Sequence, residues 1–304
     1  MPLHYELSDL RLLLILMRTR SLSASGEAAH LTTSAVSLRL RKLEDGIGAQ
    51  LFTRTGKGLV PTEAGTALAE AAVPILAEAA ALDARLNPFS KHDPEPLRIF
   101  SNSTGLQNFL GRIAADYLRE NSSFRAVLTE QRSSLTPEAV LTGEADLGLI
   151  GGIRELSPAY RTKLELVQFV EDRHVVILPR DSSAAQQFKN RPILFAELLN
   201  LRFAALTDAS PMTAAMKERA LAAGFRFEPI IEAPSFSLLV ELVARGPLAA
   251  VVPASAVPPN APVEVRELED SWAARPLAFV LPKARPALPS AIDFVEFALR
   301  TQKR

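Results

Sequence analysis

One short stretch of the chain, residues 31–44 (LTTSAVSLRLRKLE), carries hydroxyl and cationic side chains at helical spacing. Val36, Leu40 and Leu43 follow one another at steps of four and three residues, so they share one face of a helix. Hydroxyls and cations bind phosphate oxygens, and arginine also pairs with guanine, so the helix is suited to reading duplex DNA. An ordinary amphipathic surface helix is the alternative interpretation. The polar side of this helix carries Ser34, Ser37, Leu38 and Arg41, with Arg39 and Lys42 beside them.

Two further helices are predicted before this one, over residues 7–17 and 23–30. Thr32 and Thr33 form a tight turn ahead of the third helix, and either can cap its first turn. Three short helices with a tight turn between the second and third match the helix-turn-helix pattern. Gly26, inside the second helix, costs about 1 kcal/mol relative to alanine. That cost is acceptable only if close packing leaves no room for a side chain.

A basic hairpin is predicted after the third helix. Residues 50–54 and 59–60 read as two short strands joined by TGKG, which places Arg54 and Lys57 at the tip or edge of a β-wing. Such a wing lies along the DNA backbone or in the minor groove. A solvated turn is the alternative for the hairpin taken alone. The N-terminal module, residues 1–61, is therefore predicted to be a winged helix-turn-helix DNA-binding domain.

Residues 62–87 are rich in alanine and leucine and predict one long linker helix. Steps of four and three residues give it an apolar seam, which favours a dimerisation helix over a helix packed only on its own domain. Pro74 removes one backbone hydrogen bond and should kink the helix unless a neighbour absorbs the bend. The Pro-rich, polar residues 88–96 predict a hinge. The seam consists of Leu68, Ala72, Ile75, Ala79, Leu82 and Leu86.

The remaining residues, 97–304, alternate between strand and helix patterns, which predicts parallel α/β sheets. Two such sets predict two lobes. We assign residues 97–163 and 268–304 to lobe I, because the last strand and helix return to it, and residues 164–267 to lobe II. A two-lobed arrangement of this kind encloses a cleft. The fold class is therefore α+β overall: a winged helix-turn-helix, a long linker helix, then a two-lobed α/β domain.

Ligands of parallel sheets bind at the carboxyl ends of strands, beside helix N-termini. Four loops satisfy this rule, and their hydroxyls and amides are suited to a small carboxylate, with an arginine as counter-charge. The alternative is that these residues only cap the helices that follow. The candidates are Ser101, Asn102, Ser103, Thr104, Arg132, Ser133, Ser134, Gly151, Gly152, Thr207 and Ser210.

The run SAVSLRLRKLEDGIGAQLFTRTGKGLVPTEAG, residues 34–65, resembles the N-terminal domain of LysR-type transcriptional regulators, and the match extends over residues 7–87. Leu38 departs from the family, which often has a polar residue there; a leucine can instead meet a thymine methyl group. The resemblance implies that the linker helix dimerises and that the C-terminal domain is an effector-binding domain like periplasmic binding proteins. Carried over by position, the DNA contacts are Thr32, Thr33, Ser34, Ser37, Leu38, Arg39, Arg41, Lys42, Arg54 and Lys57.

Composition and the absence of known motifs limit the classes of function that the chain can have. The 304 residues include no cysteine and only four histidines, none of them spaced with a second ligand, so neither a metal nor another cofactor is predicted. Net charge is zero, but residues 18–62 hold seven Lys or Arg side chains against three acidic ones. No phosphate loop, dinucleotide fingerprint or nucleophile elbow is present. We therefore expect a non-enzyme; a small-molecule α/β enzyme or a solute-binding protein with an accessory N-terminal module is the alternative.

The function predicted from the sequence is a DNA-binding transcriptional regulator whose promoter activity responds to a small-molecule effector bound between the lobes. Its expected partners are double-stranded promoter DNA, an effector of the carboxylate class, a second copy in a homodimer or homotetramer, and RNA polymerase. The apolar run at residues 10–17 is too short to cross a bilayer, and no signal peptide precedes it, so a cytoplasmic location without membrane association is expected.

Overall fold

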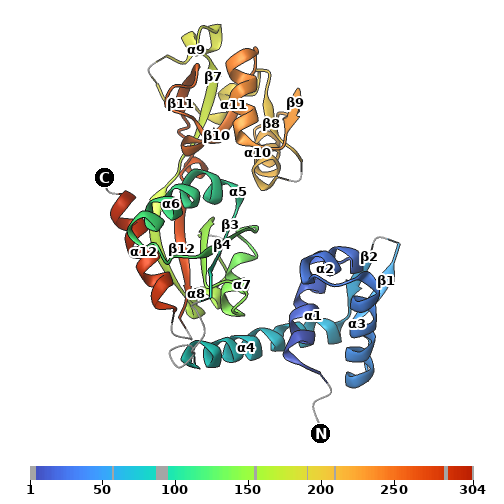
Figure 1. Cartoon of the computed structure of the whole chain (residues 1–304). Coiled ribbons are helices and arrows are strands. Elements are labelled where there is room, and N and C mark those ends of the chain that lie inside the picture. The colour runs from blue at the N-terminus through green and yellow to red at the C-terminus, as the bar shows by residue number, and fades with distance from the viewer. Residues whose placement is uncertain are drawn as a thin grey trace.

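The computed structural model describes residues 5–56, 58–86, 95–153, 156–189, 191–208, 210–283 and 287–302. The predicted wing residue Lys57 and residues 88–94 of the predicted hinge lie outside these ranges. A small helical domain, one long helix and two α/β lobes follow one another along the chain (Figure 1). This arrangement agrees with the fold class predicted from the sequence.

The N-terminal domain is a three-helix unit with a β-hairpin. Its core contains the fully buried residues Leu13, Val36 and Leu51, so the apolar face predicted for the third helix packs inward. The second helix begins one residue earlier than predicted because Ser21 is its N-cap and accepts a hydrogen bond from the Ala24 amide. The elements are α1 (Leu7–Thr19), α2 (Leu22–Ala29), α3 (Thr33–Ile47), β1 (Phe52–Thr55) and β2 (Gly58–Pro61).

Gly26 lies where helix α2 approaches the start of α3. A Cβ atom added at Gly26 would lie 2.6 Å from the carbonyl oxygen of Leu31, closer than such atoms approach in proteins. The Leu31 amide donates a 2.8 Å hydrogen bond to the Gly26 carbonyl, which fixes this approach. The expectation that close packing excludes a side chain at Gly26 is confirmed.

Helix α4 (Glu63–Leu86) continues through Pro74 without interruption, and Pro74 itself is exposed. One face of α4 is buried in the core of the N-terminal domain through Ala69, Ala72 and Leu76. The assignment of Ala72 to an exposed dimer seam is therefore wrong, because the heptad pattern did not distinguish the domain's own core from a partner. By length and composition alone α4 is also apolar enough to span a membrane, a test that core helices of soluble proteins pass as well.

Lobe I is built on a five-stranded sheet with the order β4-β3-β5-β12-β6. The first three strands along the chain pair in parallel, as predicted, and β12 returns antiparallel between β5 and β6. Its core includes Ile99, Phe279 and Phe294. The strands are β3 (Leu97–Ser101), β4 (Ala126–Glu130), β5 (Leu147–Gly151), β6 (Leu164–Glu171) and β12 (Pro276–Pro282). The helices of lobe I are α5 (Ser103–Gly105), continued by a π-helical segment Leu106–Leu110 and α6 (Gly111–Glu120), then α7 (Thr136–Leu141), α8 (Pro158–Lys163) and α12 (Pro289–Gln302).

The predicted lobe boundary at residue 164 is wrong. Strand β6 pairs with β12 along its whole length, from Leu164 opposite Pro282 to Glu171 opposite Pro276, so residues 164–171 belong to lobe I. The chain enters lobe II only after Glu171. The apolar residues of β6 alone gave no sign of which sheet they would join.

Lobe II contains an antiparallel sheet of order β10-β7-β11 and the parallel pair β8-β9, so the prediction of a parallel sheet in this lobe is wrong except for β8 and β9. A bridge between Phe203 and Ala249 links the two sheets. Strand β11 was not predicted from the sequence. The strands are β7 (His174–Pro179), β8 (Ala204–Leu206), β9 (Ile231–Ala233), β10 (Ala250–Pro253) and β11 (Val263–Glu267), and the helices are α9 (Ser183–Gln187), α10 (Pro211–Ala222) and α11 (Phe236–Arg245).

The close approach at Gly26 can be tested by substitution. We expect Gly26→Ala to lower the free energy of unfolding of the N-terminal domain by roughly 1–3 kcal/mol, because backbone atoms would have to move. Hydrogen exchange of peptides covering α2 and α3 in the full chain measures this loss. Gly111→Ala is the matched control, because a Cβ there meets its nearest neighbour, the Leu106 carbonyl oxygen, only at 3.4 Å. Equal protection in both variants would contradict the packing argument.

Candidate nucleic-acid interface and inter-lobe cavity

Helix α3 presents the polar face predicted for it. Thr32 is its N-cap, with the side-chain oxygen accepting a 3.2 Å hydrogen bond from the Ala35 amide. Leu38 is 55% exposed although it is apolar, which leaves it free to meet a base edge. The side chains on this face that are exposed are those of Thr32, Thr33, Ser34, Leu38, Arg41 and Lys42, while Ser37 and Arg39 are half-buried.

Two contacts fix the wing to α3. Arg54, exposed on β1, donates a 3.1 Å hydrogen bond from Nη2 to the Ser37 hydroxyl, so these two predicted DNA contacts come from different elements but lie together. Glu44 Oε1 accepts hydrogen bonds from the amides of Leu51 at 2.8 Å and Phe52 at 3.3 Å. The sequence did not reveal this role of Glu44, because its partners are backbone groups seven and eight residues away.

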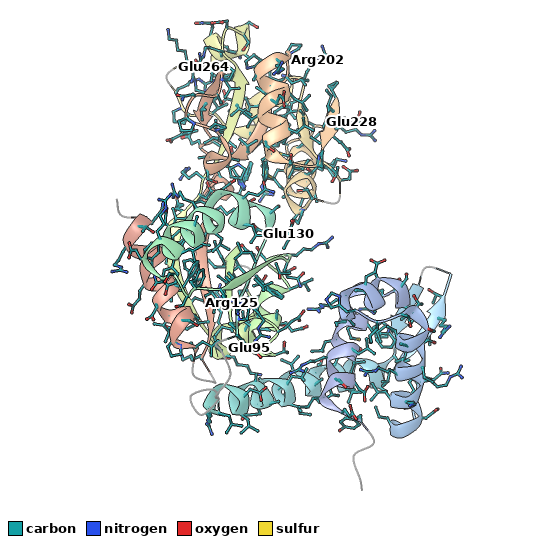
Figure 2. All side chains as sticks on the ribbon, viewed as in Figure 1. Glu95, Arg125, Glu130, Arg202, Glu228 and Glu264 are labelled. Atoms are coloured by element: carbon teal, nitrogen blue, oxygen red, sulfur yellow. The ribbon has the colours of Figure 1, made fainter. Side chains whose placement is uncertain are left out.

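The strand-end loops of lobe I converge, as the rule for parallel sheets predicted. Asn102 donates a 2.8 Å hydrogen bond to the Ser133 hydroxyl, which also accepts a 3.3 Å bond from the Gly151 amide. Figure 2 shows that Glu130, at the end of β4, lies on the side of lobe I toward lobe II, whereas Glu95 and Arg125 lie at the opposite end. The carboxyl ends of β3, β4 and β5 therefore face the second lobe.

Two of the predicted ligand contacts are not available to a ligand. Ser101 is fully buried, and its hydroxyl donates a 2.6 Å hydrogen bond to the Leu149 carbonyl within the sheet. Thr104 is only 5% exposed. Their assignment to the effector site is wrong, because residues at a strand end and in the first turn of a helix also close the core beneath them.

The other residues predicted for the effector site differ in exposure and in hydrogen bonding. Asn102 is the N-cap of α5 and accepts a hydrogen bond from the Gly105 amide, as the capping alternative anticipated. Within the described residues, no hydrogen bond joins Thr207 or Ser210 of lobe II to the loops of lobe I. Arg132, Ser134, Gly152 and Thr207 are exposed, while Ser103, Ser133 and Ser210 are half-buried and Gly151 is buried.

A cavity of about 260 Å³ lies where the chain passes between the lobes. Lobe I contributes Gly152 and Ile153, helix α10 of lobe II contributes Arg219, and the returning segment contributes Trp272 and Arg275. Of the predicted ligand contacts only Gly152 lines it. Sequence reasoning missed the others because they are spread over more than a hundred residues and form no local motif.

The side chains around this cavity are electrostatically unusual. Burial, with the charges of Arg275 and Arg219, lowers the pKa of His174 to about 4, so the imidazole is neutral at pH 7. Burial also lowers the pKa of Arg275, and the negative charge of Asp172 opposes that effect. The Arg219 guanidinium lies 4.8 Å from the Trp272 ring centroid, a cation–π contact.

Asp172 stands at the first crossing between the lobes. Burial raises the pKa of its carboxyl group, opposed by hydrogen bonds from Ser255 and by Arg275. Its two oxygens accept bonds from the Ser255 amide at 3.1 Å and the Ser255 hydroxyl at 2.8 Å. Asn108 of the π-helical segment donates a 2.8 Å bond to the same hydroxyl, so Ser255 connects the two lobes.

The most buried carboxylate of lobe I has a structural partner. Asp146 forms an ion pair with Arg98, with 2.7 Å between Oδ1 and Nη2, and also accepts a bond from the Arg98 amide. These contacts give Asp146 a structural role in the packing of β3 against β5. In the part of the chain that the structure describes, no group of three or more His, Cys, Asp or Glu side chains is arranged to hold a metal ion.

The chain has the architecture of a one-component regulator. A winged helix-turn-helix is joined through a long helix to a two-lobed ligand-binding domain. Residues 7–66 match the family model "Bacterial regulatory helix-turn-helix protein, lysR family", and residues 90–303 match "LysR substrate binding domain". The chain belongs to the LysR family of transcriptional regulators. The resemblance seen in the sequence is confirmed.

Individual relatives are distant. The chain is 28% identical over 184 residues to the HTH-type transcriptional regulator YeiE of Escherichia coli (strain K12), an alignment that covers 60% of each chain. A full-length OxyR variant from Pseudomonas aeruginosa is similar in structure, with a TM-score of 0.61 at 20% identity over 98% of this chain and 95% of that one. Full-length CbnR complexed with its target DNA gives a TM-score of 0.52 at 18% identity over 98% and 100%. These two structures share the fold.

The neutral state of His174 predicts a pH dependence. Folded His174 takes up a proton only near pH 4, and unfolded histidine near 6.5, so the unfolded chain binds more protons between these values. Stability should therefore fall as pH decreases from about 6.5 to 4, by up to about 3 kcal/mol from this group. His174→Gln should remove that contribution. Urea unfolding of both proteins from pH 7 to pH 4 measures it, and a difference independent of pH would contradict it.

Proposed function

We propose that this chain is a sequence-specific regulator of transcription that binds promoter DNA through α3 and the wing and responds to a small molecule bound between its lobes. The observation that carries the proposal is the attachment of the wing to an exposed polar helix, through the hydrogen bond from Arg54 to Ser37 and through those that Glu44 accepts from the Leu51 and Phe52 amides. A recognition helix must be held in this way to enter a major groove in one orientation. The target DNA bound by CbnR in its solved complex supports the same use of this fold.

The predicted DNA contacts divide into two roles. Lys42 and Arg54, with Lys57, would bind phosphates and give salt-dependent affinity. The side chains that would contact base edges are those of Ser34, Ser37, Leu38 and Arg41, together with Thr32 and Thr33 at the start of α3. The half-buried Arg39 would lie beside them. Regulation would follow from an effector that binds one arrangement of the lobes better than another, without catalysis. The expected setting is the bacterial cytoplasm, with RNA polymerase as the downstream partner.

The exposed side of α4 is proposed as the dimer contact. Ile75, Leu82 and Leu86 are 42%, 58% and 54% exposed, an unusual density of large apolar side chains on one helix face. Leu68 and Ala79, both half-buried, lie on the same side at heptad spacing. Two copies joined through this face would present two recognition helices to successive DNA turns, as a homodimer or within a homotetramer.

Arg41 is the sharpest test of DNA recognition. We expect Arg41→Ala to weaken binding to a duplex selected by the wild-type protein by about 1–3 kcal/mol, because an exposed guanidinium on α3 is suited to a base edge or a phosphate. Fluorescence anisotropy at fixed salt measures the affinity. Arg226→Ala is the control, since that side chain is 87% exposed in lobe II. Equal affinity of both variants would exclude Arg41 from the interface.

A substitution in the proposed dimer contact should change the mass of the protein in solution. Leu82→Glu should raise the dimer dissociation constant at least tenfold, because it removes a buried apolar contact and places two like charges together. Analytical ultracentrifugation of the full chain measures this. Leu221→Glu makes the same substitution at a leucine that is 71% exposed on α10, and it should leave the mass unchanged. The proposed face is wrong if Leu82→Glu sediments like the control.

A further inference from the structure

The cavity between the lobes is lined by two cationic side chains. Two guanidinium groups, Arg219 and Arg275, line it together with the neutral imidazole of His174, and none of the described lining residues is acidic. We propose that this cavity, rather than the strand-end loops, binds the effector, and that the effector is a small carboxylate with a short apolar body. The inference rests on the proposed function and names the ligand class and the residues that recognise it.

Arg275 is the first of the two cations. A Cβ atom on Gly151 would lie 2.5 Å from Arg275 Nε, so only glycine at the end of β5 lets the guanidinium take this position. Among the described residues, the Arg275 side chain donates no hydrogen bond. The nearby carboxylate, Asp172, already accepts two bonds from Ser255. Arg275 therefore has N–H donors available for a ligand.

Arg219 is the second cation, and it comes from the other lobe. One of its nitrogens, Nη1, donates a 2.9 Å hydrogen bond to the Ala215 carbonyl of its own helix. Its guanidinium plane contacts Trp272, which holds the group in place without neutralising its charge. A guanidinium presents paired donors that match the two oxygens of a carboxylate, which a neutral ligand would not exploit.

Two buried nitrogen atoms at the cavity strengthen the argument. His174 Nδ1 and Trp272 Nε1 have no hydrogen-bond partner in the part of the chain that the structure describes, and both side chains line the cavity. Buried polar atoms are nearly always paired in folded proteins, so unpaired ones need an explanation. Four side chains with unused hydrogen-bonding or charge capacity at one cavity indicate a site that a polar ligand completes.

The rest of the lining defines the body of the ligand. Ile153, Met212, Ala274 and Pro276 supply apolar surface to the same cavity. A volume of about 260 Å³ lies just below the range of roughly 300–1,000 Å³ usual for small-molecule sites, so the ligand must be small. Contacts from lobe I, lobe II and the segment between them mean that such a ligand would stabilise one arrangement of the lobes.

The chain contains a single tryptophan, Trp272, which lines the cavity and makes its fluorescence a specific reporter. Full-length protein would be titrated with two matched pairs of an acid and its amide: phenylacetate with phenylacetamide, and hexanoate with hexanamide. We expect a saturable change in emission with at least one acid, and at least tenfold weaker binding of its amide, which has the same shape without the charge.

Substitution then assigns the contact. Arg219→Gln should weaken the acid at least tenfold, whereas Arg245→Gln, at a side chain that is 80% exposed on the neighbouring helix α11, should not change it. No saturable change with either acid, equal binding of acid and amide, or equal affinity of the two variants would each overturn the proposal. DNA affinity, measured separately, distinguishes this failure from failure of the proposed regulatory function, since ligand binding is measured without DNA.

Discussion

Helix α4 packs into two cores at once, and this shared packing relates the DNA-binding domain to lobe I. Ala72 and Leu76 are fully buried against α1 and its neighbours, while Val73 contacts both that core and the lobe I cluster around α7. Further along α4, the Ala80 side chain occupies the place that a Cβ on Gly143 would need, with only 2.5 Å between them. Small residues allow this close approach on two sides, and the Arg18–Glu144 ion pair at 3.3 Å adds a polar contact between the same two units. The alanine content of α4 is thus explained by packing, and its large exposed side chains remain on the side that faces away.

The two lobes are connected to each other by two chain segments that pass between them, rather than by a shared helix. Asp172 and Arg275 lie on the two segments, and the Asp172 amide donates a 2.9 Å bond to the Arg275 carbonyl, which holds them side by side. Buried charges reduce stability unless they are paired, because removing them from water is costly. The burial that lowers the pKa of Arg275 and of His174 is such a cost, and both residues lie beside the two segments that connect the lobes. Sites that break the ordinary rules of stability are where binding functions are expected.

The sequence predicted those features whose physical cause is local. The steps between Val36, Leu40 and Leu43 predict the buried face of α3, and Gly26 within a helix predicts a close approach of another segment. Features decided by distant partners were missed or misplaced. Ala72 and Ile75 share one heptad pattern, yet only Ile75 is exposed, because the pattern records an apolar stripe and not which surface covers it. The strand-end rule found the meeting of Asn102, Ser133 and Gly151, but these groups bind one another. The unpaired polar atoms of His174 and Trp272 lie instead in the inter-lobe cavity, and these residues share no sequence motif.

The packing of α4 on lobe I and the two-segment connection between the lobes limit how ligand binding can affect the DNA-binding domain. Lobe I is packed on α4, so the proposed ligand, in contact with Arg219 on lobe II and Ile153 on lobe I, would act first on the position of lobe II. Its coupling to DNA equals the difference in its affinity for the two lobe arrangements, and no larger effect is available to it. The Arg18–Glu144 contact joins the DNA-binding domain to the lobe that does not move in this scheme. Under the proposed function, lobe II would transmit the change through surfaces that it presents to other copies in an oligomer. The effector would then alter the spacing of two recognition helices rather than the shape of either one.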